Sequence, residues 1–215
     1  MSKPPKALSA NELWPLIHEQ RERVATVLAA LTEDEWNVAS LCTGWRVRDV
    51  AAHCVETQTI TPGQFFGRFV STGFRFNAFN QKGVDRHASQ STAQLLAQYR
   101  DTLRRTSSPP GPKSTWLAEA VIHGEDMARP LGRRVEVSPT ALVAAADFSR
   151  KTTTLLHGKQ RSAGLKLCAT DVDWTAGDGP EVCGPAVSII LAITGRKAAL
   201  DGLSGEGLDT LRQRL

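Results

Sequence analysis

The sequence lacks regular cysteine patterns and long apolar runs. Its four cysteines, Cys42, Cys54, Cys168 and Cys183, form no C-x-x-C pair and show no zinc-finger pattern. We expect reduced, packed thiols, with Cys168 and Cys183 facing each other across a hairpin without a disulfide. The longest apolar run covers residues 185–194. A membrane-spanning helix needs ~20 such residues, so no membrane span is expected.

The sequence also lacks a concentrated basic stretch and an apolar N-terminal segment. The formal net charge is +4, but basic and acidic residues are interleaved, and the tightest basic groups, at 104–105 and 133–134, are two residues long. Nucleic-acid-binding proteins gather basic residues on one face, so we expect no nucleic-acid partner; a mildly basic pocket for an anionic small molecule fits the charge at least as well. The first 14 residues have two lysines but no signal-peptide apolar region, which predicts a cytoplasmic protein.

Most of the sequence shows the periodicity of amphipathic helices. The pairs Ser9–Glu12 and Thr32–Glu35 match the S/T-x-x-E pattern that begins helices. From Leu165 the pattern alternates as in a strand, and a glycine-containing turn leads to a short returning strand. We therefore predict a helical bundle over residues 1–158 and a small α+β domain over residues 159–215. The predicted helices are 9–30, 32–36, 44–56, 91–105, 114–129, 138–156, 185–196 and 205–215, and the predicted strands are 165–174 and 181–184.

Residues 62–80 form an unusual aromatic segment. They hold six of the seven phenylalanines, together with three glycines and two arginines. A core helix with an aromatic face, a mobile lid over an apolar pocket and a membrane-surface patch all agree with this composition. The glycines weaken a rigid helix and favour the lid over the core element. We expect side chains of this segment to determine which small molecule binds, and the pattern does not identify that molecule.

Two segments carry residues that are able to bind one metal ion. His53 lies at the margin of an apolar helix face, and Glu119 and His123 are four residues apart, so that they project from one face of a helix. Two histidines and one carboxylate form the ligand set of catalytic zinc sites with an open position, and they also suit Fe(II), Mn(II) or Ni(II). Each motif alone is more often a local hydrogen-bonding pair. Spacing alone therefore leaves both interpretations open.

The same segments resemble a known family. "LCTGWRVRDVAAHCVE", residues 41–56, resembles the "cpGWtvrdvvaHl" signature of the mycothiol-dependent maleylpyruvate isomerase family, within the DinB-like metalloenzyme superfamily. "AEAVIHGEDMARPLG", residues 118–132, is similar to the second signature of this family, in which an acid and a histidine four apart precede G-x-D. Residues 165–196 are similar to its small C-terminal domain. The resemblance extends from about residue 31 to about residue 200.

The resemblance implies a mainly α fold, a DinB-like up-and-down four-helix bundle with a small C-terminal α+β domain. It further implies that His53, Glu119 and His123 hold a divalent metal, usually zinc, and that Arg196 binds the anionic thiol or substrate in catalysis. The implied function is a metal-dependent isomerase or S-transferase that uses mycothiol and acts on a small electrophilic substrate. The alternative is a non-catalytic ligand-binding or regulatory protein that keeps the bundle.

The sequence also leads to expectations for three residues near the predicted metal ligands. Asp126, three residues after His123, and Asp49, four residues before His53, are carboxylates that either orient a metal ligand or lie on a helix surface. Cys54 follows His53 directly, and adjacent helix residues diverge by about 100°. We therefore expect Cys54 to be a buried packing thiol and not a nucleophile.

Overall fold

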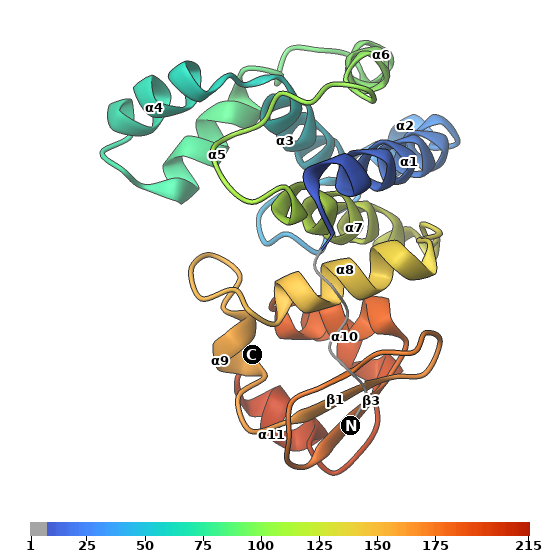
Figure 1. Ribbon diagram of the computed structural model, residues 1–215. Helices are drawn as coiled ribbons and strands as arrows, with labels where there is room; N and C mark the ends of the chain where they lie inside the picture. Colours follow the sequence, from blue (N-terminus) through green and yellow to red (C-terminus); the bar gives the residue numbers. More distant parts are fainter. Residues whose placement is uncertain (1–7) are drawn as a thin grey trace. The chain divides into compact units, whose positions relative to one another are not determined.

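The computed structural model describes residues 8–215. Over this range the protein is mainly helical with a small three-stranded sheet, as predicted (Figure 1). The signal-peptide prediction concerns a segment of which residues 1–7 lie outside the described part. The helices are α1 (Ala10–Ala29), α2 (Glu33–Trp36), α3 (Val47–Thr59), α4 (Pro62–Ser71), α5 (Phe76–Asp85), α6 (Thr92–Asp101), α7 (Ser114–Ala128), α8 (Pro139–Ser149), α9 (Gly158–Arg161), α10 (Ala186–Ile193) and α11 (Leu208–Gln213), with the 3-10 helices η1 (Arg129–Leu131) and η2 (Lys197–Gly202) and the strands β1 (Lys166–Ala169), β2 (Thr175–Ala176) and β3 (Glu181–Gly184).

Residue contacts divide the chain into two compact units. Unit 1 contains the chain up to Leu13, Lys113–Ile122 and Val137–Leu215, and unit 2 contains Trp14–Pro112 and His123–Glu136. Because α7 contributes residues to both units, this division does not follow chain order. The domain boundary at residue 158 stays a prediction. Among the described residues, no helix combines the length and apolar character that a membrane crossing requires.

Unit 2 is a group of helices around α3, which packs against α2, α5 and α6. At α7, a Cβ atom on Gly124 would lie 2.8 Å from Val24 Cγ2 on α1, so only glycine allows this close helix approach. Burying each large apolar side chain of this core contributes about 1.5–3 kcal/mol to the free energy of unfolding. The core includes Val24, Leu28, Trp36, Val50, Val55, Leu95, Tyr99 and Met127.

Capping hydrogen bonds place most helix starts of unit 2 where the sequence predicts them. The Thr32–Glu35 capping box is present at α2, and a further box at Ser91 begins α6. The start of α3 corrects the prediction of a helix from residue 44. There the Arg46 backbone N–H donates to the Asp49 carboxylate at 2.9 Å, so the helix begins at Val47.

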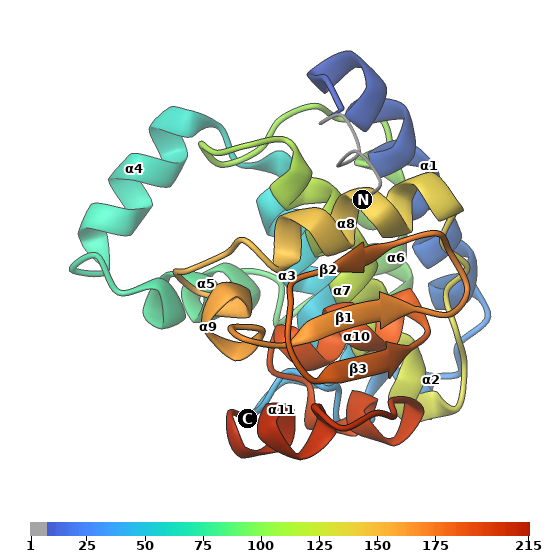
Figure 2. The same ribbon diagram turned by 60° about the horizontal axis from the view of Figure 1, so that its bottom comes forward.

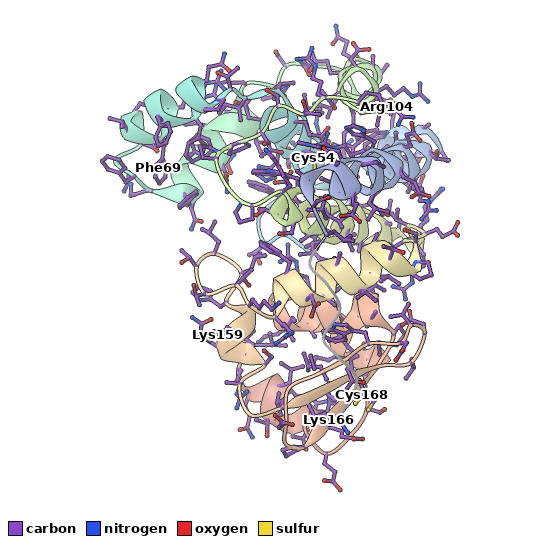
Figure 3. The ribbon with its side chains drawn as sticks, in the orientation of Figure 1. Cys54, Phe69, Arg104, Lys159, Lys166 and Cys168 are labelled. Carbon is purple, nitrogen blue, oxygen red and sulfur yellow. The ribbon has the colours of Figure 1, made fainter. Side chains whose placement is uncertain are left out.

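The aromatic segment forms two helices, α4 and α5, instead of one. They are separated by a turn in which Gly73 and Phe74 have φ angles of 61° and 59°. All of α4 is described and none of its residues is buried, so the core-helix interpretation of this helix is wrong. Phe66 and Phe74 are 58% and 66% exposed, and the lid and the membrane-surface patch stay predictions for this segment. Figure 3 labels Phe69 on α4, where its ring contacts four other phenylalanine rings.

Unit 1 contains the sheet, whose strand order is β2-β1-β3 (Figure 2). The predicted hairpin between residues 165–174 and 181–184 is wrong, because β1 pairs antiparallel with β2 and parallel with β3. After β1 the chain reverses direction into β2. It then reverses again into β3, which runs parallel to β1 along the other edge of β1. Leu167 and Val182 point into a core with α8 and α10. α8 ends at Ser149, short of the predicted residue 156.

Candidate metal centre

His53 and His123 meet inside unit 2, as the sequence predicts for two metal ligands. His53 is 7% exposed in the middle of α3, and His123 is half-buried on α7. Their ring centroids are 5.1 Å apart and the ring planes are 86° apart. The Trp45 ring, 5.2 Å from the His53 ring, covers another side of His53. Two imidazoles at this separation can bind one small ion or share a proton.

Asp126 holds one edge of the His123 ring. Its side chain is completely buried, and its Oδ2 lies 2.9 Å from His123 Nδ1. The Leu41 backbone N–H donates to the Asp126 carbonyl oxygen at 3.0 Å, which ties the loop before α3 to α7. A carboxylate at Nδ1 favours the tautomer with the proton on Nδ1, so the Nε2 lone pair is left for an ion.

Cys42 is the site residue that sequence reasoning missed, since the cysteines were interpreted as packing residues. Its Sγ donates to Asp126 Oδ2 at 3.1 Å and lies 3.8 Å from His123 Nδ1. Ligand atoms of Cys42, His123 and Asp126 all lie within 4.8 Å of one another and are able to hold an ion at Nδ1. The available signal was the position of Cys42 within the same signature segment as His53.

The two histidines have opposite pKa shifts. Burial, and then the positive charge of His123, lower the pKa of His53 to about 3. For His123, burial lowers the pKa, but hydrogen bonds to Asp126 and Cys42 outweigh it and raise the pKa to about 10. Without a bound metal at neutral pH, His123 is protonated and carries a positive charge. His53 is neutral, so one of its two nitrogens presents a lone pair that is able to bind an ion.

The other predicted site residues lie in unit 1. Glu119 is half-buried on α7, one turn before His123 on the same helix. Arg196 precedes η2, and its Nη1 donates to the Thr194 carbonyl oxygen at 2.9 Å. Their roles at the metal stay predictions. In unit 2, Asp49 accepts hydrogen bonds from Arg46 at the start of α3, and Cys54 is 2% exposed in the core, as expected for a packing thiol.

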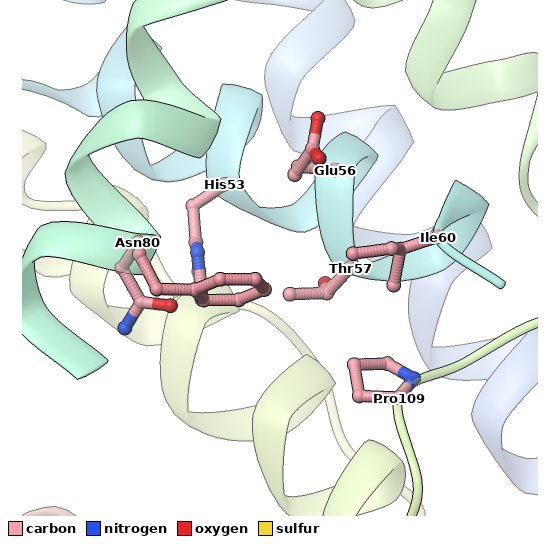
Figure 4. Close-up of a pocket in the computed structure, with 7 residues that line it drawn as sticks. His53, Glu56, Thr57, Ile60, Asn80 and Pro109 are labelled. Atoms are coloured by element: carbon pink, nitrogen blue, oxygen red, sulfur yellow. The ribbon is translucent and has the colours of Figure 1, made fainter. Parts of the chain in front are cut away.

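A small pocket opens beside His53. Figure 4 shows that α3 contributes His53 and Glu56 to its wall. Its cavity volume is about 10 Å³, room for about one water molecule. Apolar carbon and a few polar atoms form its wall. The remaining lining residues are Thr57, Ile60, Phe79, Asn80 and Pro109.

Glu56 connects this pocket to the aromatic helices. Its carboxylate pairs with Arg68 of α4 and, at 2.9 Å, with Arg86, and it lies 3.4 Å from His87 Nε2. Burial raises the pKa of Glu56, but the hydrogen bond with His87 and the two arginines lower it below its ordinary value. The Glu56 charge therefore anchors α4 and the end of α5 at the edge of the pocket.

The chain is similar to proteins of one known family. Residues 17–111 match the mycothiol maleylpyruvate isomerase N-terminal domain family. Two solved structures have the same fold over 93% of this chain and 93% of their own: a mycothiol-dependent maleylpyruvate isomerase (TM-score 0.60, 14% identity) and a histidine-to-alanine mutant of such an isomerase (TM-score 0.57, 14% identity). No curated protein matches the chain. The resemblance inferred from the sequence is thereby confirmed over residues 17–111, which match the mycothiol maleylpyruvate isomerase N-terminal domain family.

Proposed function

We propose that the protein is a metal-dependent enzyme that uses mycothiol to isomerise, or to transfer the thiol to, a small electrophilic substrate. The meeting of His53 and His123 beside a pocket carries this proposal. The family match over residues 17–111 and the two isomerase structures of the same fold support mycothiol as the thiol. The neutral His53 imidazole and the Asp126 hydrogen bond behind His123 support the metal, whose binding would displace the proton from His123 Nε2.

His53 and His123 Nε2 fit a divalent ion, and the resemblance to the family adds Glu119 as the proposed third ligand. A metal ligand must present a neutral lone pair, and the low pKa of His53 keeps its imidazole neutral at physiological pH. Asp126 occupies the Nδ1 edge of His123, as carboxylates do behind metal-bound histidines. Binding through Nδ1 beside Cys42 would break this hydrogen bond, so we favour Nε2. Two histidines and a carboxylate suit zinc.

Side chains of the protein would bind the reactants and exclude water during the reaction of the thiol. When bound, the ion lowers the pKa of a thiol so that the nucleophilic thiolate exists at neutral pH. Phe79 and Ile60 form apolar pocket walls that exclude water from a reacting electrophile. Arg196 would hold a carboxylate of the thiol or the substrate through its guanidinium. Thiolate addition to a double bond, rotation and elimination of the same thiolate give isomerisation, whereas retention of the adduct gives S-transfer.

Metal analysis followed by calorimetric titration with mycothiol tests this function. We expect about one bound metal per chain, thiol binding that chelation abolishes, and turnover of maleylpyruvate or a related unsaturated acid by the metal-loaded protein. Equally tight mycothiol binding to metal-free protein, without turnover, would support the non-catalytic binding protein instead. His18→Ala is the matched control, since His18 is a half-buried histidine of unit 2 outside the pocket.

A further inference from the structure

Unit 1 contains a second cluster of metal-binding side chains, on the sheet. Cys168 of β1 and Cys183 of β3 are direct partners in the parallel pair. Glu181 lies two residues before Cys183, and alternate residues of a strand point to the same face. Ligand atoms of the three side chains all lie within 4.8 Å of one another. The cluster is therefore built by strand register and does not depend on loop conformation.

The cluster lies on the outer face of the sheet and is accessible. Leu167 and Val182, the neighbours of the two cysteines, are buried toward α10, whereas Cys168 and Cys183 are only half-buried. Lys166 and Cys168 are labelled on β1 in Figure 3. An ion can thus reach the thiols from solvent.

Lys166 orients the carboxylate of the cluster. Its Nζ lies 2.7 Å from Glu181 Oε1, and the second oxygen, Oε2, lies 3.8 Å from Cys183 Sγ. The ion pair is part of the strand register, because Lys166 and Glu181 are direct partners. One carboxylate oxygen therefore faces the lysine and the other faces the thiols.

Strand spacing is compatible with either an ion or a disulfide between the two cysteines. Neighbouring strands lie about 4.7–4.9 Å apart, within the range of about 4.4–6.8 Å that separates the Cα atoms of a disulfide. Two thiolates on a tetrahedral zinc, with Zn–S of about 2.3 Å, are about 3.7 Å apart and need no closer approach of the strands. Both cysteines are free thiols in the structure.

We propose that Cys168, Cys183 and Glu181 bind a thiophilic divalent cation of the zinc class, independently of the centre at His53. Each thiol releases one proton when the ion binds, and no oxidation state changes. The three ligands leave one coordination position to water or a further ligand. The ion links β1 to β3 across the parallel pair, which is slightly less stable per residue than an antiparallel pair.

Cadmium titration of the reduced, chelator-treated full-length protein tests this site, since thiolate-to-cadmium charge transfer absorbs in the near ultraviolet. The His53→Ala/His123→Ala protein serves as background, so that the result does not depend on the proposed enzyme. We expect saturation of the band at one equivalent, and zinc should displace the cadmium. Cys168→Ser and Cys183→Ser should each remove at least half of the band amplitude, and Glu181→Gln should weaken cadmium binding about tenfold.

Cys42→Ser and Cys54→Ser are the matched controls and should keep the full band. Circular dichroism checks that each variant is folded; a serine variant that unfolds is replaced by Cys168→Ala or Cys183→Ala. The proposal is wrong if the band follows Cys42, if it survives in the Cys168→Ser/Cys183→Ser protein, or if the reduced background protein binds no cadmium. Loss of cadmium binding together with a mass decrease of two hydrogens on exposure to air, prevented by either serine variant, would identify a redox dithiol instead and overturn the metal site.

Discussion

The imidazole rings of His53 and His123 meet nearly at right angles, with their centroids 5.1 Å apart, although they come from helices far apart in the sequence. The buried Asp126 carboxylate lies behind His123, and the Trp45 ring lies beside His53. This arrangement fixes both imidazoles within one unit of the protein. The expectations for metal binding depend on it.

His53→Ala and His123→Ala should each lose most of the bound metal, because removal of one imidazole leaves too few ligands for a tight site. Elemental analysis after gel filtration measures the metal, and far-ultraviolet circular dichroism should show that the helices remain. Glu119→Gln should lose metal in the same way. Full metal occupancy in Glu119→Gln would show that Glu119 is not a metal ligand. It would not contradict the assignment of the two histidines as ligands.

Asp126→Asn should weaken metal binding by about 10–100-fold, the usual effect of losing the carboxylate behind a histidine ligand. The neutral amide no longer fixes the proton on His123 Nδ1. The dissociation constant is measured by competition with a chromophoric chelator. Asp49→Asn is the control, because Asp49 caps α3 through Arg46 and should leave the affinity unchanged. Equal losses in both variants would contradict a specific role of Asp126.

The Glu56–His87 contact predicts a pH dependence of stability. The hydrogen bond to Glu56, although burial opposes it, raises the pKa of His87 above its ordinary 6.5. Its stabilisation is therefore fully present below pH 6.5 and is lost as the pH rises through the raised pKa. The pKa of Glu56 is lowered from 4.5, so its contribution is present above pH 4.5 and is lost as the pH falls through the lowered pKa.

The pair therefore stabilises the fold most between pH 4.5 and 6.5. Urea unfolding at a series of pH values should show the wild-type free energy of unfolding decreasing above pH 6.5. In His87→Gln this decrease should be smaller. An unchanged pH profile in that variant would show that His87 does not stabilise the fold through Glu56.

Phe79→Ala should change the preference among electrophilic substrates more than it changes metal content. Phe79 is 7% exposed in the pocket wall. The centroid of its ring lies 5.2 Å from that of Phe65 and 5.9 Å from that of Phe69, both on α4. Removing the ring enlarges the pocket and loosens α4. Ratios of kcat/KM for substrates of different size measure this change. Phe66→Ala is the control, since Phe66 is 58% exposed and does not line the pocket.

Arg196→Lys should keep the fold and the metal but weaken binding of an anionic ligand or turnover at least tenfold, which corresponds to about 1.4 kcal/mol. Lysine keeps the charge and loses the planar, two-pronged hydrogen bonding of a guanidinium to a carboxylate. Steady-state kinetics and mycothiol titration measure the effect. Wild-type values in both would show that Arg196 does not bind the anionic ligand.

Most helices were predictable from the sequence because they rest on local pattern, whereas the two histidines were identified through the resemblance to a family. The capping boxes at Thr32 and Ser91 and the spacing of apolar residues act within a few positions of the chain, and the structure contains the corresponding helices. The start of α3 was misplaced, since the Arg46–Asp49 cap does not match the S/T-x-x-E pattern.

Only the tertiary structure decided which groups meet. The Cys42 contact with Asp126 joins a loop to a distant helix, and the pairing of Cys168 with Cys183 depends on β3 joining the far edge of β1. The exposure of α4, which Arg68 attaches to Glu56, is not visible in its composition. Local hydrogen bonds and periodicity determine where a helix forms, whereas long-range packing determines what its side chains contact, and several packings are compatible with one local pattern.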